Sequence, residues 1–362
     1  MASRIGVTLE KLRLEYTEAD AEFLWKTHEA LVGMDEEERN RIGWGVLCER
    51  WPNPDDFIQN VFRIRTKKPG FTPLLRYNEA QVMLMTRIRA QQRSGKPVRI
   101  IILKARQTGF STVEQGFLSE RVLRSANRRA ACIADERPKA GEIFRMSVLF
   151  RAGALFQPAL AAERRSEIET LDGSLYTVMT ANNLESGRGI TAHDVHASEF
   201  AYWEKGEAVM GGILNALSDD PDTSLVIEST ANGMSNLYYE MWKMASDGIA
   251  SDWIPIFMPW WSHKAYTKVL TRDQALRLLD SLSPEEQDYR NQFGLTAGQL
   301  AWRRWAIPNK CQNSPQLFKQ EYPAFPEEAF LYSGSPAFDQ KRIAKLKALC
   351  VPEKIRADVI VL

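Results

Sequence analysis

Short apolar runs alternate with amphipathic stretches along most of this chain. The runs that predict strands cover residues 98–103, 130–134, 174–179, 225–227 and 254–258. Because parallel strands need long crossover connections, strands separated by helices favour a mainly parallel central sheet flanked by helices. We therefore expect an α/β fold.

A helix-start signal precedes the first predicted strand. Thr17 is followed three residues later by an acidic residue, and an apolar group begins at Phe23. A second charged segment follows at residues 35–41. Residues 1–65 are therefore predicted to form a helical accessory segment.

Stronger helix signals follow the last predicted strand. Ser283 precedes a proline and has a glutamate three residues on, Gly294 can end that helix, and Thr296 can begin another. These signals predict a helical lid over about residues 270–310. The lid would belong to the main domain, which we place at residues 66–335.

Composition places the chain among large globular proteins. With 362 residues, 44% of them hydrophobic, it can bury a large core. No apolar stretch approaches the ~18 residues of a membrane span, and the N-terminus lacks a secretory signal, so we expect a cytoplasmic protein. The four cysteines are too scattered for a zinc site. The 47 Lys and Arg balance 46 Asp and Glu, so a nucleic acid would have to contact local patches.

The segment after the first predicted strand is close to a phosphate-binding loop. It reads Lys104, Ala105, Arg106, Gln107, Thr108, Gly109, Phe110, Ser111 and Thr112, and we take all nine as candidate nucleotide-binding residues. The Walker A pattern would place glycine at 104 and lysine at 110, so here the lysine has moved to the start of the loop. Gly109 would supply the turn, Ser111 a hydroxyl for Mg²⁺, and Lys104 and Arg106 positive charge. An ordinary corner between a strand and a helix has the same pattern, and the segment alone does not decide between the two.

An acidic residue follows another predicted strand. Glu199 stands where a carboxylate can polarise the attacking water of a nucleotide hydrolase. Ser198 stands where an aspartate is usual and adds no negative charge, so Mg²⁺ would depend more on Ser111, with Ser198 acting through a metal-bound water. His193 and His196 suggest a metal cluster, but a strand directs them to opposite faces, which favours polar residues on a peripheral strand.

Three further features fit a nucleotide site. The apolar run at 225–227 leads into a small, hydroxyl-rich turn that can contact a γ-phosphate, namely Ser229, Thr230, Ala231, Asn232 and Gly233. Gln81 has an amide that can pair with adenine, although such a residue more often faces solvent on a helix. Arg188 stands between two glycines and suits neutralisation of transition-state charge, although surface arginines are common.

Together these residues resemble the ATPase part of the large terminase subunit of tailed bacteriophages, the motor that drives DNA into a procapsid. The resemblance runs from about Tyr77 to Asp339 and also includes later segments, which are Pro259-Trp260-Trp261, residues 299–304, Gln320-Glu321-Tyr322-Pro323 and residues 326–330. Some members of that family carry the loop lysine at the start of the loop and an aromatic residue in its usual place. Lys104 and Phe110 stand in these two positions.

The resemblance implies a P-loop NTPase fold of the ASCE, RecA-like kind that uses ATP and Mg²⁺. Lys104 and Arg106 would bind phosphates, Ser111 would help to hold Mg²⁺, and Glu199 would activate water. Arg188 would act as an arginine finger, in the same subunit or its neighbour. The turn at residues 229–233 would couple hydrolysis to movement. Ser198 departs from the family's usual aspartate, and the departure bears on metal affinity and turnover.

The partners that the resemblance implies are double-stranded DNA, a small terminase subunit and the portal protein of the procapsid. We expect a homo-oligomeric ring when the motor is assembled on the procapsid in the host cytoplasm, with no membrane involved, and the isolated chain can stay monomeric. DNA would be held by its backbone, and the candidate cations are Arg63, Arg65, Lys67 and Lys68, or Arg303 and Arg304. Either cluster also fits a solvated charged surface.

Large terminases normally continue into an RNase H-like nuclease domain. Residues 336–362 resemble the linker and at most the start of that domain, so we expect no nuclease activity from this chain. Two other functions are compatible with the motifs. One is a helicase-like DNA translocase, and the other is a non-hydrolysing nucleotide-binding module, which Phe110 and Ser198 would suit.

Overall fold

The structure is a computed structural model that describes residues 7–182 and 191–331. Its strands are β1 Val98–Lys104, β2 Arg129–Ala134, β3 Leu160–Glu163, β4 Glu167–Thr170, β5 Leu175–Thr180, β6 Asp194–Ser198, β7 Ser224–Ser229 and β8 Ile254–Met258. The helices before β6 are α1 Leu9–Arg13, α2 Glu18–Ala30, α3 Glu36–Arg50, α4 Pro54–Val61, α5 Glu79–Arg93, α6 Phe110–Leu123 and α7 Arg137–Ala152. The later helices are α8 Gly206–Ala216, α9 Leu237–Ser246, α10 Arg272–Asp280, α11 Pro284–Phe293, α12 Ala297–Lys310, α13 Pro315–Glu321 and α14 Pro326–Leu331. Two short 3₁₀ helices are η2 Phe200–Tyr202 and η3 Trp260–Ser262.

The strands form one mixed sheet in the order β3-β4-β5-β2-β6-β7-β1-β8. The pairs from β5 through β8 are all parallel, as the alternation of strands and helices predicted. The edge formed by β3, β4 and β5 is antiparallel and was not expected from the sequence. Strands β6, β7 and β1 are neighbours at the centre, so three of the predicted motifs end side by side.

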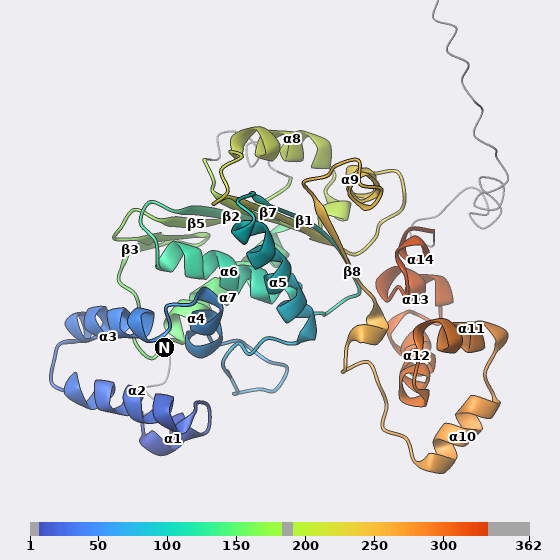
Figure 1. Ribbon diagram of the computed structural model, residues 1–362, viewed down its shortest axis with the longest axis horizontal. Coiled ribbons are helices and arrows are strands. Elements are labelled where there is room, and N and C mark those ends of the chain that lie inside the picture. Colours follow the sequence, from blue (N-terminus) through green and yellow to red (C-terminus); the bar gives the residue numbers. More distant parts are fainter. Residues whose placement is uncertain (1–6, 183–190, 332–362) are drawn as a thin grey trace, which may run out of the picture.

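Helices cover both faces of the sheet (Figure 1). On one face α5, α6 and α7 pack through an apolar core that includes Ile100, Ile102 and Val226. On the other face α8 and α9 pack against Leu103 and Ile227. Because successive residues of a strand point to opposite faces, Lys104 and Glu228 continue the row that faces α6. The two charged residues therefore lie on the side of the sheet where the loop after β1 enters its helix.

Two helical groups flank the sheet. Helices α1–α4 share a core with α7, in which Phe62 stacks on Phe150 with ring centroids 5.1 Å apart. Beyond β8, helices α10–α14 are grouped together (Figure 1), and α12 and α13 pack around Trp302 and Phe318. Among the described residues, no helix is long and apolar enough to cross a bilayer.

The capping signals read from the sequence are confirmed. Thr17 caps α2, and Ser283 and Thr296 each form a capping box with the residue three positions on. Gly294 ends α11 with φ +66°, a conformation that glycine adopts without strain. Each of these helices therefore begins or ends where its local sequence stabilises the exposed backbone groups.

Candidate functional site

The loop between β1 and α6 has the backbone geometry of an anion cradle. Gln107 has φ +57° and Gly109 has φ +86°, so both lie in the left-handed region and the chain turns sharply into α6. No described side chain caps this helix. Its first N–H groups are thus available to an anion such as a phosphate.

Asparagine and glutamine side chains at the start of α5 hold this loop in place. Asn78 donates to the carbonyl of Thr108 at 3.1 Å, and Gln81 Nε2 donates to the carbonyl of Gly109 at 2.9 Å. A Cβ at residue 109 would lie 2.9 Å from Gln81 Nε2, which is too close, so the position requires glycine. Gln81 Oε1 accepts from the Asn78 N–H in the capping box of α5. Both polar atoms of the Gln81 amide, which we expected to meet adenine, are therefore engaged by the protein.

Phe110 explains why the loop lysine stands elsewhere. Its side chain is buried in the core below the loop, against apolar residues of the sheet and of α5. An ammonium at this position would be buried among apolar groups, at a high cost in desolvation. Only the backbone of Phe110 can face an anion, and the positive charge has to come from another residue.

Lys104 supplies that charge at the carboxyl end of β1. Its ammonium lies 3.0 Å from Glu199 Oε1 and 3.8 Å from Glu228 Oε2. Burial by itself would lower the pKa of Lys104, but the two carboxylates outweigh it and raise the pKa above its usual value. The lysine is charged, and it is held by protein carboxylates in this structure.

Glu199 lies at the end of β6 in a strained conformation. Its φ of +53° places a non-glycine residue in the left-handed region, which costs of order 1–3 kcal/mol and is typical of functional sites. The turn directs one carboxylate oxygen to Lys104 and the other to the turn after β7. Oε2 accepts from the Thr230 N–H at 3.3 Å and lies 3.5 Å from Ser229 Oγ.

Glu228 is a site residue that could not be identified from the sequence. It is fully buried near the end of β7, and Oε1 accepts hydrogen bonds from Ser111 and, at 3.3 Å, from Ser198. Burial would raise the pKa of Glu228, but Lys104, His196 and the Ser111 hydroxyl together lower it to about 2. Its position as the acid directly before the Ser229 turn was the only signal in the sequence.

His196 and His193 have protein partners. His196 is buried, with Nδ1 2.7 Å from Gln115 Nε2 and Nε2 3.2 Å from Glu228 Oε1. His193 Nδ1 accepts from the Arg129 N–H at 3.0 Å. Over residues 7–182 and 191–331, no group of three His, Cys, Asp or Glu side chains has the arrangement of a metal cluster.

Arg106 points away from the loop towards the helical group after β8. Its guanidinium forms an ion pair with Glu321 at the end of α13, with Nη2 3.1 Å from Oε1, and its backbone N–H donates to the Glu321 carbonyl at 3.1 Å. The hydroxyl of Tyr266 donates to the Arg106 carbonyl. Arg106 therefore joins the loop to the helices in this structure, whereas from the sequence we expected it to bind phosphate.

The turn at residues 229–233 connects Glu199 with α13. Tyr202 Oη lies 3.0 Å from Thr230 Oγ1, and Asn232 Nδ2 donates to the Ala201 carbonyl at 3.1 Å. On its other side, Gln320 Nε2 donates to the Ala231 carbonyl at 3.2 Å. A continuous set of hydrogen bonds thus runs from the acid at the loop to the helical group.

The remaining predicted residues are distributed as follows. Ser111 and Ser198 meet at Glu228, and Thr112 follows in α6. Arg188 and Gly189 lie outside the described residues.

Several arginines expected to contact DNA form ion pairs within the chain. Arg303 is buried and pairs with Glu285 at 2.8 Å, and Arg304 pairs with Glu286 at 2.7 Å. Arg63 donates to Glu15 at 2.7 Å. These side chains stabilise contacts between helices, so they are poorly placed to form a DNA-binding surface.

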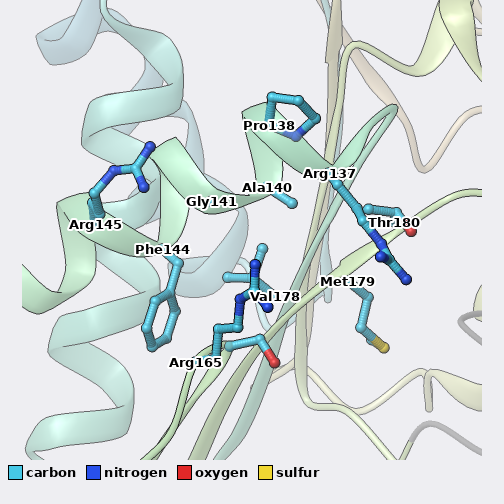
Figure 2. Close-up of a pocket in the computed structure, with 11 residues that line it drawn as sticks. Arg137, Pro138, Ala140, Gly141, Phe144, Arg145, Arg165, Val178, Met179 and Thr180 are labelled. Carbon is cyan, nitrogen blue, oxygen red and sulfur yellow. The ribbon is translucent and has the colours of Figure 1, made fainter.

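A separate arginine-lined cavity lies between α7 and β5. Its volume is about 970 Å³. Figure 2 shows Arg137 and Arg165 extending into it beside Val178 and Thr180. Within the described part of the chain, no carboxylate pairs with either of these two arginines. Thr180 ends β5 at the carboxyl edge of the parallel strands, which is also the edge of the phosphate loop.

Comparison with known proteins gives structural matches only. No family model and no curated sequence matches the chain. The large terminase of bacteriophage HK97 matches with a TM-score of 0.52 and 14% identity, over 78% of this chain and 55% of that one. The chain shares the fold of that terminase. The chain therefore spans about half of the HK97 protein, and the match confirms the α/β P-loop NTPase fold expected from the sequence.

Two further solved structures are more distant. The large terminase ATPase domain of Thermus phage P74-26 matches with a TM-score of 0.44 and 18% identity, over 69% of this chain and 93% of that domain. The large terminase of another thermophilic bacteriophage, solved in complex with ADP, matches with a TM-score of 0.40 and 13% identity, over 59% of this chain and 50% of that one.

Proposed function

We propose that this chain is the ATP-hydrolysing motor domain of a viral DNA-packaging terminase, which couples ATP hydrolysis to translocation of double-stranded DNA into a procapsid. The observation that carries the proposal is the meeting of Lys104, Ser111 and Glu199 at the loop between β1 and α6. An anion cradle, a cation that can turn to the phosphates and a carboxylate at one strand edge are the parts that phosphoryl transfer to water requires.

Nucleotide binding would redirect Lys104. The loop N–H groups would receive the β-phosphate, and the ammonium would turn from Glu199 and Glu228 to the β- and γ-oxygens. The Ser111 hydroxyl and the buried carboxylate beside it are oxygen donors of the kind that Mg²⁺ prefers, so the residues fit this ion. When bound there, Mg²⁺ would supply neutralisation of phosphate charge.

Hydrolysis would begin at Glu199. Once Lys104 turns to phosphate, one oxygen of Glu199 is free to orient and deprotonate a water, while Thr230 and Ser229 hold the other. Arg188, as an arginine finger in the same subunit or a neighbour's, would stabilise the transition-state charge. Gln81 supports this chemistry by keeping the loop in shape, and contact with adenine remains part of the proposal.

Movement would pass through the turn after β7. Loss of the γ-phosphate changes what Glu199 contacts, Glu199 holds Thr230, and Gln320 holds the same turn from α13. Release of the turn would therefore shift α13 and the helices packed on it. The ion pair between Arg106 and Glu321 is a second connection on the same route.

DNA would be gripped through its phosphates, because packaging must accept any sequence. The arginine-lined cavity between α7 and β5 suits this role better than the paired arginines of α12. Assembly into a ring with head-to-tail contacts, on the portal protein and with the small subunit, would place such cavities around the DNA.

Turnover by a Glu199→Gln variant tests the hydrolytic role. We expect this variant to bind fluorescent ADP as well as the wild type, and to hydrolyse ATP about 10²- to 10⁴-fold more slowly. Glu204→Gln, an exposed residue on the same loop, is the matched control and should behave as the wild type. A wild-type protein that hydrolyses no ATP, with DNA and at high protein concentration, would favour the non-hydrolysing module. Equal turnover in Glu199→Gln and wild type would remove Glu199 from the chemistry.

A further inference from the structure

Glu228 sits where three elements of the site converge. In the register of the sheet it lies opposite Ser198 of β6 and Ile102 of β1. Residues in register on parallel strands point to the same face, so Glu228 and Ser198 both face α6. Ser111, in the first turn of that helix, reaches the same point.

The carboxylate is engaged on one oxygen and open on the other. Oε1 accepts from the hydroxyls of Ser111 and Ser198. Oε2 is buried and has no hydrogen-bond partner among the residues that the structure describes, and the Lys104 ammonium lies 3.8 Å from it. A buried anionic oxygen without a hydrogen bond carries a desolvation cost that a cation would offset.

The position of Glu228 answers the question that Ser198 raises. In P-loop ATPases the metal is held by the loop hydroxyl and by an acidic residue from a neighbouring strand. Ser198 has no charge, but Glu228 on the adjacent strand is ionised and already bonded to the loop hydroxyl of Ser111. The required pair of oxygen donors is therefore complete, with the acid on β7 and not on β6.

We propose that Glu228 supplies the carboxylate of the Mg²⁺ site, in the role that an aspartate at position 198 would otherwise have. The inference rests on the proposed function, since it concerns the metal that accompanies ATP. Lys104 occupies the vicinity of Oε2 in this structure. When the ammonium turns to the phosphates it leaves a negatively charged oxygen next to the Ser111 hydroxyl, which is the arrangement that a hard divalent cation prefers.

Metal-dependent nucleotide affinity tests the assignment without using turnover. The affinity for fluorescent ADP is measured with excess Mg²⁺ and with EDTA, and Mn²⁺ bound in the ADP complex is followed by electron paramagnetic resonance. We expect Glu228→Gln to weaken metal binding by about 10- to 100-fold and to keep the affinity for ADP in EDTA. Adding Ser198→Asp to Glu228→Gln should restore metal binding, because it returns a carboxylate from β6.

Glu114→Gln is the matched control. It also replaces a fully buried glutamate of the same polar region, but Glu114 has no bond to Ser111 in the part of the chain that the structure describes, so metal binding should not change. If Glu228→Gln does not fold, Glu228→Asp tests the same point by withdrawing the carboxylate by one methylene, and it too should weaken Mn²⁺ binding.

The outcomes separate this inference from the function on which it rests. Wild-type Mn²⁺ affinity in Glu228→Gln, with intact ADP binding, overturns the metal role of Glu228 alone. An equal loss of ADP affinity with and without metal also overturns it, because Glu228 would then only shape the loop. If the wild-type protein binds no nucleotide under either condition, the proposed function is contradicted and the metal assignment with it.

Discussion

The Lys104 ammonium lies 3.0 Å from Glu199 Oε1, so the cation from the start of the loop and the acid after β6 form an ion pair in this structure. Each residue occupies the group that the other would need for catalysis. Binding of a triphosphate would resolve this pairing, because phosphate oxygens compete for the ammonium. The ion pair would therefore couple nucleotide binding to the release of Glu199 for its reaction with water.

Replacement of Lys104 should separate binding from folding. In Lys104→Ala the buried carboxylate of Glu228 loses its ammonium, so we expect the free energy of unfolding to fall by ~3–5 kcal/mol and ATP turnover to be lost. Lys96→Ala, which removes an exposed lysine paired with Asp252, should change neither quantity. Urea unfolding and steady-state ATP hydrolysis measure the two effects. Unchanged turnover in Lys104→Ala would show that this lysine does not serve the phosphates.

The ion pair between Arg106 and Glu321 gives opposite predictions for its two members. If Arg106 leaves Glu321 to bind phosphate, Glu321→Gln frees the guanidinium and should raise nucleotide affinity by about 2- to 5-fold, whereas Arg106→Ala should lower it. Titration with fluorescent ADP measures both, with the exposed Glu327→Gln as control. Equal affinities in all variants would mean that Arg106 only joins the loop to α13.

The arginine-lined cavity predicts a change in the salt dependence of DNA binding. Each phosphate contact contributes about −0.9 to the slope of log affinity against log salt, so removing Arg137 and Arg165 together should reduce the steepness by about 2. Arg164, which pairs with Glu167 and Glu169, is the control, and Arg164→Ala should leave the slope unchanged. Binding isotherms on duplex DNA at several salt concentrations decide the point. A slope unaffected by the double variant would place the DNA on another surface.

Glu114 should make stability depend on pH. It is fully buried on α6, lies near His196, Asp194 and Glu228, and neither of its oxygens has a hydrogen-bond partner in the described part of the chain. Burial raises the pKa of Glu114 from 4.5 to about 8 in the folded state.

The sign of the effect follows from proton binding. Between pH 4.5 and 8 the folded protein keeps a proton that the unfolded chain releases, so this group lowers stability as pH rises, by about 1 kcal/mol per pH unit. Glu114→Gln should remove that slope and be the more stable protein at pH 8. Urea unfolding in EDTA across this range measures it, with the exposed Glu37→Gln as control. Parallel stability curves for Glu114→Gln and wild type would contradict the raised pKa.

The central strands could be read from the sequence because both faces are covered. Residues 98–103 and 225–227 are almost continuously apolar, as buried parallel strands usually are, and β1 and β7 contain them. The hairpin of β3 and β4 gave no such signal. It lies at the sheet edge, is only partly buried and mixes alanines with charged residues, so it was missed.

The site was predictable where the signal is local and hidden where it depends on register. Lys104, Ser111 and Glu199 each follow a recognisable strand or open a helix. The role of Glu228 depends on which strands lie beside β7, and the partner of Arg106 lies 215 residues further along the chain. Neither relationship can be obtained from periodicity or from a motif.

A crystal structure with a non-hydrolysable ATP analogue and Mg²⁺ tests the central claim, that the loop lysine acts from position 104. The account predicts that Lys104 Nζ moves off Glu199 and lies within ~3 Å of a β- or γ-phosphate oxygen. If the triphosphate fills the loop while the Lys104 ammonium still contacts Glu199 and Glu228, the account is contradicted.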